Sequence, residues 1–573
     1  MHAPDLADYD FLMRHVIGGH PLGAGTQDLD LATRSLEQMA RLSRDMIDPL
    51  AVMLDRTGCK FENGRVSVPS EFKAAFDQFA THGWLGASLP EKWGGSGLSE
   101  LTQTAISEIV NGACVPFGML ALLTRAGTRT LLEHAPPELR DAVVPRLLDG
   151  QWTATICMTE PNAGSDARLM TTAAIPLGNG TYAISGTKIF ISFGDHDITD
   201  QIVHIVLARI SGNTKSLSLF LVPKFKLDDG RQNGVNTLRI ESKLGLHGSP
   251  TCVIELDGAI GYPLGSAGQG LQSIFTMVNT MRLEVAVQGI ALASRAAAAA
   301  WRYASERIQG SDTMQRPVTI NRHPDIQHML MAMRTQTEGM RALVFQVAAL
   351  VDQSHASSSV NRDAAAALVA WLLPICKAAS SEMAVAVTNL AIQVHGGHGY
   401  MKDHPVERYL RDARILPIYE GTTGIQAIDL VLRKLRKNQR REYKVFCDAI
   451  LRDLEDTAPA PEYSDIRNAV LVTVDILQAE TDRIADFAET DALAAATPYL
   501  MLNALAATGW MWLRMAKAKG ADKQVLAAKQ TLARFYAGDL VASAQYLAAK
   551  IQRGAKGLPL PEDLERTSIA ARA

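Results

Sequence analysis

The nine residues Met158-Thr159-Glu160-Pro161-Asn162-Ala163-Gly164-Ser165-Asp166 lie where the character of the chain changes. Before them the pattern is mainly helical; residues 101–110, for example, carry apolar side chains at helical spacing without Pro or Gly. From residue 152 onward, short apolar and β-branched runs alternate with clusters of Gly, Asn, Asp and Pro, which is typical of an antiparallel β domain. The small residues and backbone donors of 158–166 suit a planar, polar cofactor edge or a phosphate. An ordinary turn rich in Asx and Ser residues explains the pattern as well.

Helical periodicity returns near residue 270 and continues to the C-terminus, with Pro459 and Pro461 marking a linker. The order of helices, strands, helices and a further helical block does not alternate β and α, which argues against a Rossmann sheet. The sequence therefore predicts a multi-domain α+β fold. We expect an N-terminal helical domain at 1–151, a middle β domain at 152–272, a helical bundle at 273–440 and an additional helical domain at 441–573.

Composition and charge exclude several classes of protein. The 573 residues exceed one ordinary core, and 47% are hydrophobic and 20% charged, a normal globular balance. The net charge of -3 is spread along the chain, so nucleic acid and anionic membranes are not expected partners. The longest apolar stretch, 364–376, is shorter than the ~18 residues of a membrane span. The N-terminus lacks a signal pattern, and we expect a cytoplasmic protein without a membrane span.

Two further motifs could contact a ligand. Gly186-Thr187-Lys188-Ile189-Phe190-Ile191-Ser192 resembles a strand with an aromatic residue two positions before a hydroxyl, which suits a flavin ring, although a plain core strand is an equal reading. Gln393-Val394-His395-Gly396-Gly397-His398-Gly399-Tyr400 ends a long helix, and its glycines let the backbone approach a ligand; a helix C-cap followed by a loop is the alternative. No Cys or carboxylate cluster accompanies the two histidines, so we predict no metal site.

Glu420 is the candidate catalytic base. It lies in the stretch Ile418-Tyr419-Glu420-Gly421-Thr422, just before a helix that Thr423 and Gln426 open as a capping box. A carboxylate beside apolar neighbours has its charged form disfavoured, which suits a general base; an exposed loop acid is the alternative. The chain has no GxxxxGK[ST] loop, no GxGxxG after a strand in a βαβ unit, no HExxH and no GxSxG elbow.

Taken in order, these motifs resemble the acyl-CoA dehydrogenase family from about residue 70 to 436. Gly83-Trp84-Leu85 with Leu89-Pro90-Glu91 and Gly94-Gly95 is similar to the family's N-terminal helical signature. The 158–166 run resembles its first flavin signature, and Phe190-Ile191-Ser192 its aromatic-isoleucine-hydroxyl triplet. The segments 393–399 and 418–422 resemble its two C-terminal signatures.

The resemblance implies an acyl-CoA dehydrogenase-like fold: an N-terminal helical domain, a middle antiparallel β domain and a C-terminal four-helix bundle, with FAD between the last two and across a subunit interface. It implies cofactor contacts at Met158, Thr159, Ser165, Phe190, Ser192, Arg307, Gln393, Gly396, Gly397 and Thr422. Arg307 would meet the pyrophosphate of a neighbouring subunit's FAD, and 393–397 the adenosine end. Substrate contacts would fall on Ser165, Arg282 and Gly421.

The implied reaction is α,β-dehydrogenation of an acyl-CoA, in which Glu420 takes the α-proton and the β-hydrogen leaves as hydride to flavin N5. The backbone N–H of the base residue and a ribityl hydroxyl of FAD would stabilise the charge that develops on the thioester carbonyl. Electrons would then pass to an electron-transfer flavoprotein, as in fatty acid metabolism.

Some positions depart from the family pattern. Asn279 replaces a frequent Asp three residues before Arg282, which weakens that assignment, and Pro324 replaces a glutamine that contacts FAD. Some relatives carry their base at the position of Met281, which cannot take a proton and so favours Glu420.

The segment beyond about residue 440 resembles the extra helical domain of the family's longer branch, and the chain is closest in pattern to its 3-methylmercaptopropionyl-CoA subgroup. That branch favours a homodimer. Two rival functions remain: an acyl-CoA oxidase that uses dioxygen, and a flavin-bearing nucleic-acid-associated protein. Residues 441–573 contain 16 Lys/Arg and 18 Asp/Glu, whereas a DNA-binding domain should be basic.

Overall fold

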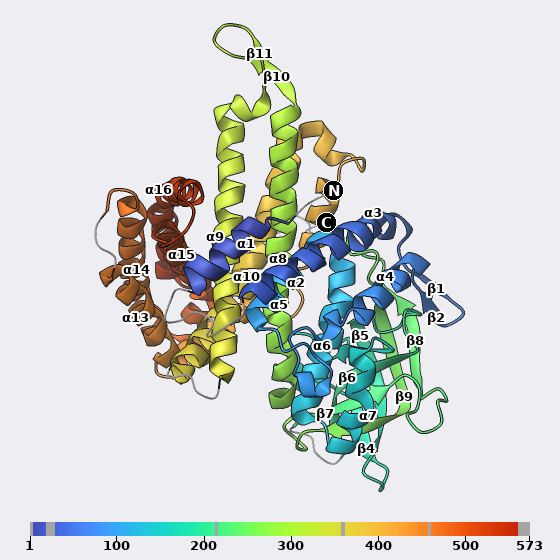
Figure 1. The fold of residues 1–573 in the computed structure, drawn as a ribbon. Coiled ribbons are helices and arrows are strands. Elements are labelled where there is room, and N and C mark those ends of the chain that lie inside the picture. Colours follow the sequence, from blue (N-terminus) through green and yellow to red (C-terminus); the bar gives the residue numbers. More distant parts are fainter. Residues whose placement is uncertain (1–3, 19–28, 212–215, 357–360, 457–459, 560–573) are drawn as a thin grey trace, which may run out of the picture. The chain divides into compact units, whose positions relative to one another are not determined.

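The structure, a computed structural model, describes residues 4–18, 29–211, 216–356, 361–456 and 460–559 (Figure 1). It contains two compact units. Unit 1 comprises Met1–Ala365 and Ser380–Thr422, and unit 2 comprises Ala366–Ala379 and Thr423–Ala573. One long helix, α10 (Arg362–His395), contributes residues to both units. This division into two units does not test the predicted domain boundaries at 151, 272 and 440, which stay a prediction.

The N-terminal part of unit 1 is helical, as predicted. Its principal helices are α1 (Leu6–Phe11), α2 (Leu29–Leu42), α3 (Asp48–Thr57), α4 (Ser70–Thr81), α5 (Glu100–Ala113), α6 (Val115–His134) and α7 (Pro137–Leu148). A short hairpin, β1 (Lys60–Glu62) and β2 (Arg65–Ser67), precedes α4. Helix α5 begins where Ser99 Oγ accepts the backbone N–H of Thr102 at 3.1 Å, an N-cap that satisfies one of the first free amides.

A seven-stranded sheet forms the β domain of unit 1. Its strands are β3 (Trp152–Cys157), β4 (Ala173–Pro176), β5 (Tyr182–Ser192), β6 (Gln201–Ile210), β7 (Ser218–Pro223), β8 (Val235–Ile240) and β9 (Thr251–Leu264). The pairings β6–β4, β4–β5, β5–β9, β9–β7 and β7–β6 close a ring, with β3 added to β6 and β8 to β9. Apolar side chains such as Ile184, Ile191 and Phe220 fill its core.

The predicted β domain is confirmed, with one difference in strand direction. Strands β3 and β4 each run parallel to β6, whereas the other pairings are antiparallel. A parallel pair needs a long connection, and residues 158–200 provide it between β3 and β6. The 158–166 loop is the first part of this connection and directly follows the end of β3.

Long helices follow the sheet in unit 1. Helix α8 (Gly270–Glu306) and α9 (Pro324–His355) are joined by the hairpin β10 (Ile308–Ser311) and β11 (Pro317–Thr319), which caps both helices at the top of Figure 1. Helix α11 (Val406–Ala413) comes after α10. Windows in α8 and in residues 362–400 are apolar and long enough to cross a membrane, but 78% of each is buried within the protein, as in core helices. The expected absence of a membrane span stays a prediction.

Unit 2 is helical. It contains α12 (Thr423–Ile428), a π-helical continuation Asp429–Lys437, α13 (Arg441–Glu455), α14 (Ser464–Asp486), α15 (Glu489–Ala516) and α16 (Lys523–Arg553). Trp371, from the α10 segment of this unit, donates from Nε1 to Asn503 Oδ1 at 3.2 Å and contacts Tyr443. The predicted additional helical block is therefore confirmed as helix.

We predict that His196 makes the β domain sensitive to acid. Its buried Nδ1 accepts the Ile198 N–H at 3.2 Å, so the ring is neutral, and burial lowers its pKa to about 3. Between the unfolded pKa of about 6.5 and pH 3 only the unfolded chain takes up the proton, so stability falls as pH falls, by about 2 kcal/mol at pH 5. Urea unfolding at pH 7 and pH 5 measures this loss. His196→Asn should reduce the difference between the two pH values by that amount, and an unchanged difference would contradict the assignment.

Candidate active site

A buried ion pair fixes the loop that follows β3. Lys188 Nζ on β5 lies 2.9 Å from Glu160 Oε1, and both side chains are buried. The same Nζ donates to the carbonyl oxygens of Met158 at 3.1 Å and Leu207 at 2.8 Å, so three acceptors meet its three donors. The ammonium group therefore ties the loop to β5 and β6.

Glu160 also fixes the start of β4. Its carboxylate accepts the backbone N–H of Thr171 at 2.6 Å and the hydroxyl of Thr172 at 2.6 Å. Burial raises the pKa of Glu160, but the charge of Lys188 and these hydrogen bonds outweigh burial and lower the pKa to about 2. Glu160 is thus a structural anion at neutral pH, and its role is to position the loop.

Four of the predicted cofactor residues are brought together by this arrangement. Met158 and Thr159 leave β3 directly beside β5, because the Ile189 N–H donates to the Thr159 carbonyl oxygen at 2.8 Å. Phe190 and Ser192 follow on β5. Ser165, also predicted, is exposed further along the same loop.

Phe190 presents an exposed ring from a strained backbone. Its φ is 61°, a left-handed value that is unusual for a bulky residue, and the residue is 60% exposed. The pairing of β5 with β9 shifts register between Lys188 and Ile191, and this bulge turns Phe190 outward while Ile191 stays in the core. An exposed aromatic face beside Met158 and Thr159 can stack on a planar ring.

Glu420 lies in a loop with two successive left-handed residues. Its φ is 55° and that of Gly421 is 92°. Such a conformation costs a non-glycine residue on the order of 1–3 kcal/mol and often marks a functional site. Glu420 is partly buried, with Ile418 half exposed on one side and Gly421 on the other. Thr422, the last residue of unit 1, is partly buried as well.

A second group of predicted residues surrounds a hollow at the end of α8. The hollow has a volume of about 410 Å³ and is lined by Arg307, Gln393, Gly396, Gly397 and neighbouring residues. A Cβ built on either glycine would have no atom within 4 Å, so open space lies against this backbone. A guanidinium group opposite open glycine backbone fits a phosphate-bearing ligand, which supports the expected dinucleotide contact.

Aromatic and imidazole rings form one wall of this hollow. Tyr303 stacks on His395 with ring centroids 4.4 Å apart, and its hydroxyl is 2.7 Å from His398 Nδ1. His398 in turn stacks on His404. Burial lowers the pKa of His395, which favours its neutral form.

Arg282, the predicted residue near the CoA end, lies on α8. It is buried on α8, and its guanidinium carbon lies 5.7 Å from the centre of the Phe275 ring. The predicted residues thus fall into the β5 loop group, the Glu420 loop, the hollow at Arg307 and Arg282 on α8.

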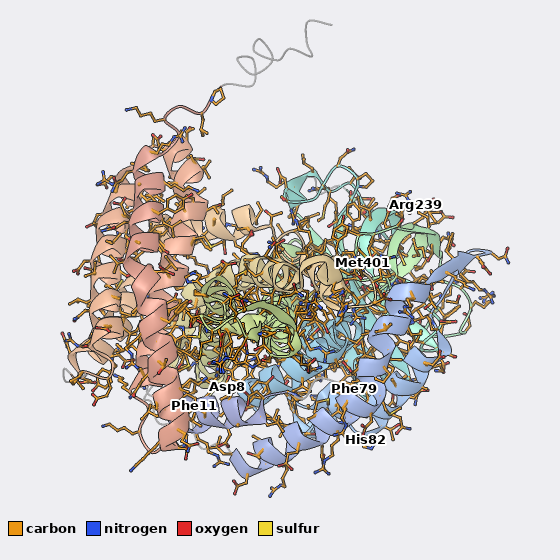
Figure 2. All side chains as sticks on the ribbon, turned by 90° about the horizontal axis from the view of Figure 1, so that it is seen from above. Asp8, Phe11, Phe79, His82, Arg239 and Met401 are labelled. Carbon is orange, nitrogen blue, oxygen red and sulfur yellow. The ribbon has the colours of Figure 1, made fainter. Side chains whose placement is uncertain are left out.

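Another hollow is not lined by any predicted site residue. It measures about 580 Å³ and lies between the N-terminal helices, α8 and α9. Arg341 in its lining forms ion pairs with Glu108 and with Asp8, which is labelled in Figure 2. Among the described residues, no group of three or more His, Cys, Asp or Glu could hold a metal ion, and the predicted absence of a metal stays a prediction.

Sequence reasoning missed Lys188, Tyr303 and Gln288. Lys188 lies four residues after the buried Ile184 on β5. Because side chains alternate between the two faces of a strand, this spacing could have placed Lys188 on the core face. Tyr303 and Gln288 lie on a long helix whose neighbours come from distant parts of the chain, and the sequence holds no local signal for them.

Comparisons with known protein families cover most of the chain. The acyl-CoA dehydrogenase N-terminal, middle and C-terminal domain models match residues 34–151, 155–259 and 268–435. A model described as acetyl-CoA dehydrogenase C-terminal like matches residues 446–559.

Individual relatives agree with these matches. The chain is 38% identical to 3-methylmercaptopropionyl-CoA dehydrogenase from Ruegeria pomeroyi, over 89% of this chain and 90% of the relative. The structure of Caenorhabditis elegans ACDH-11 in complex with C11-CoA has a TM-score of 0.81 at 22% identity, covering 97% and 95% of the two chains. An acyl-CoA dehydrogenase from Bacillus anthracis complexed with FAD has a TM-score of 0.77 at 21% identity, covering 97% and 98%. The last two show the fold.

We predict that Lys188→Met destabilises the protein by about 3 kcal/mol, because removal of one member of a buried pair leaves the other charge without its counterion. Urea unfolding measures this loss, and weaker cofactor retention should accompany it. Arg168→Ala is the control, because Arg168 forms an exposed pair with Asp166 on the same loop and should leave the midpoint unchanged. Equal midpoints for both variants would contradict the structural role of Lys188.

Proposed function

The chain belongs to the acyl-CoA dehydrogenase family of oxidoreductases, and from this premise we propose that it is an FAD-dependent enzyme that converts an acyl-CoA thioester to the 2-enoyl-CoA. The observation that carries the proposal is the Glu420 loop. A carboxylate is held there in a strained left-handed conformation, partly buried, directly before Gly421. Strain of this kind is maintained where the position of a side chain matters to function.

Glu420 is the proposed base for the α-proton. The α-proton of a thioester is far too weak an acid for a carboxylate in water, so the developing enolate charge must be stabilised. We propose that the backbone N–H of Glu420 donates to the thioester carbonyl, which places a dipole where negative charge accumulates. Exclusion of water strengthens this hydrogen bond and keeps the carboxylate close to the α-carbon.

The cofactor-binding residues are proposed as two groups. FAD, when bound, supplies the hydride acceptor N5 for the β-hydrogen. We propose that Phe190, Met158, Thr159, Ser165, Ser192 and Thr422 hold the flavin end, and that Arg307, Gln393, Gly396 and Gly397 hold the dinucleotide end. The exposed Phe190 ring and the open glycine backbone beside Arg307 support these assignments.

We propose that the protein is a homodimer. In the proposed arrangement Arg307 meets the pyrophosphate of the FAD bound by a second copy of the chain, so each site needs both subunits. We further propose that Arg282, Ser165 and Gly421 contact the acyl-CoA, that an electron-transfer flavoprotein accepts the electrons, and that the enzyme acts in the cytoplasm in fatty acid metabolism.

Replacing the proposed base should abolish the chemistry without loss of the cofactor. Glu420→Gln keeps the shape of the side chain but cannot take a proton, so we expect bleaching of the flavin absorbance by acyl-CoA to slow at least about a hundredfold. FAD content should match that of the unsubstituted protein. Glu62→Gln, at an exposed position on β1, serves as control and should bleach normally. Full-speed bleaching by Glu420→Gln would remove Glu420 from the role of base.

The electron acceptor separates a dehydrogenase from an oxidase. We expect turnover with an acyl-CoA to require an electron-transfer flavoprotein or an artificial acceptor, with little hydrogen peroxide in air. Oxygen uptake and peroxide release measured during turnover test this expectation. Peroxide formation at the rate of enoyl-CoA formation would identify an acyl-CoA oxidase instead.

A further inference from the structure

A tyrosine side chain anchors the Glu420 loop to the interior of unit 1. Tyr419, the residue directly before Glu420, donates a hydrogen bond from its hydroxyl group to Gln288 Oε1 on α8. Gln288 is fully buried. Burial, followed by the nearby charge of Glu420, raises the pKa of Tyr419 well above its ordinary value, so the hydroxyl keeps the proton that it donates.

The backbone that carries Glu420 depends on anchors of this kind. The N–H groups of Ile418 and Tyr419 both donate to the carbonyl oxygen of Ile415, at 2.9 and 3.2 Å, which forms a tight turn. Glu420 follows at once with its left-handed φ of 55°. Such a conformation costs free energy and persists only where the surroundings hold it. The Tyr419 side chain supplies a fixed point one residue before the strained position.

Gln288 lies in a part of α8 that cannot move easily. Helix α8 packs against α5, α6 and α9 (Figure 1). Ser380 Oγ on α10 donates to the carbonyl oxygen of Ala286 at 2.7 Å. At Gly289 the backbone comes so close to α10 that a Cβ would lie 2.4 Å from Ser380 Oγ. One turn before Gln288, the buried Glu284 forms an ion pair with α6. The acceptor of the Tyr419 hydrogen bond is therefore held in place from several sides.

The amide of Gln288 is not explained by packing alone. Among the residues that the structure describes, its Nε2 has no hydrogen-bond partner. A buried donor without a partner costs free energy, so an apolar side chain of similar size would suit this place better if it only filled space. What the amide adds is the acceptor oxygen for Tyr419.

We propose that Tyr419 and Gln288 are positioning residues, whose hydrogen bond holds the Glu420 carboxylate at the α-carbon of the acyl thioester. This inference rests on the proposed function, because it requires Glu420 to be the base. A displacement of about 1 Å in a reacting group can slow a reaction on the order of a hundredfold. Loss of the hydrogen bond should therefore slow proton removal, while the contacts that bind FAD and acyl-CoA elsewhere remain.

The first test compares two tyrosine variants in the FAD-loaded enzyme. Tyr499, in unit 2, is fully buried and its Oη lies 2.9 Å from Thr481 Oγ1, so Tyr499→Phe also removes a hydrogen-bonded hydroxyl group. Bleaching of the flavin is measured with saturating butyryl-, hexanoyl- and octanoyl-CoA. We expect Tyr419→Phe to bleach about tenfold more slowly. Tyr499→Phe should bleach at full rate, although both variants unfold at lower urea concentration.

The affinity of the enzyme separates a positioning role from a binding role. For Tyr419→Phe, we expect the FAD content and the dissociation constants of the matching 2-enoyl-CoA products to stay within about twofold of those of the unsubstituted protein. A loss of product affinity as large as the loss of rate would identify a binding contact instead and would overturn the positioning role.

The second test examines the acceptor. Gln288→Leu should slow bleaching as much as Tyr419→Phe does, and the double variant Tyr419→Phe/Gln288→Leu should be no slower than either, because the same hydrogen bond is lost only once. Gln288→Glu keeps an acceptor oxygen and should bleach within about threefold of the unsubstituted rate.

Two outcomes would overturn the positioning role while the proposed function stands: full-rate bleaching by Tyr419→Phe, or rate losses that multiply in the double variant. The first of these needs only Tyr419→Phe, which keeps the aromatic ring, so the proposal stays testable if Gln288→Leu does not fold. Failure of the FAD-loaded, unsubstituted protein to bleach with any of the three acyl-CoAs would overturn both the positioning role and the proposed function.

Discussion

Lys188 Nζ lies inside the β domain with three oxygen acceptors around it: the Glu160 carboxylate and the carbonyl oxygens of Met158 and Leu207. A charge in such a place is tolerated only when it is fully paired. The pairing therefore dictates where the loop after β3 must lie, which is directly against β5. Met158 and Thr159 on the loop and Phe190 on the strand come together for this reason, although their segments are separated by a long connection.

Two of the site residues store backbone strain. Phe190 and Glu420 both adopt left-handed φ values, and each is held there by its surroundings. A register shift against β9 enforces the conformation at Phe190, and Gly421 continues the left-handed turn that begins at Glu420. The Phe190 ring and the Glu420 carboxylate are thus held in fixed positions. Interactions elsewhere in the fold offset the free energy that their left-handed backbone conformations cost. Next to Glu420, Tyr419 donates a hydrogen bond to Gln288 on α8, which ties this loop to the buried face of that helix.

Much of this arrangement was predictable from sequence, and the rest depended on tertiary pairing. The change from helical to strand patterning near residue 152 predicted the β domain, because periodicity is a local property. The outward position of Phe190 was not predictable, since strict alternation places it on the same face as Lys188 and only the bulge separates them. The buried contacts of Gln288 and Glu284 could not be predicted, because their partners Tyr419, Ser107 and Arg125 come from distant parts of the chain. Likewise, nothing local placed residues 366–379 of α10 in a different unit from the rest of that helix.

The central claim is that the Glu420 carboxylate removes the α-proton. It can be isolated with a 3-thia-acyl-CoA, in which sulfur replaces the β-carbon so that no hydride can leave. The measurement is exchange of the α-hydrogens with D2O by mass spectrometry, catalysed by the FAD-loaded protein. We predict that the unsubstituted protein catalyses exchange and that Glu420→Ala slows it at least about a hundredfold. Equal exchange rates in the two proteins would contradict it.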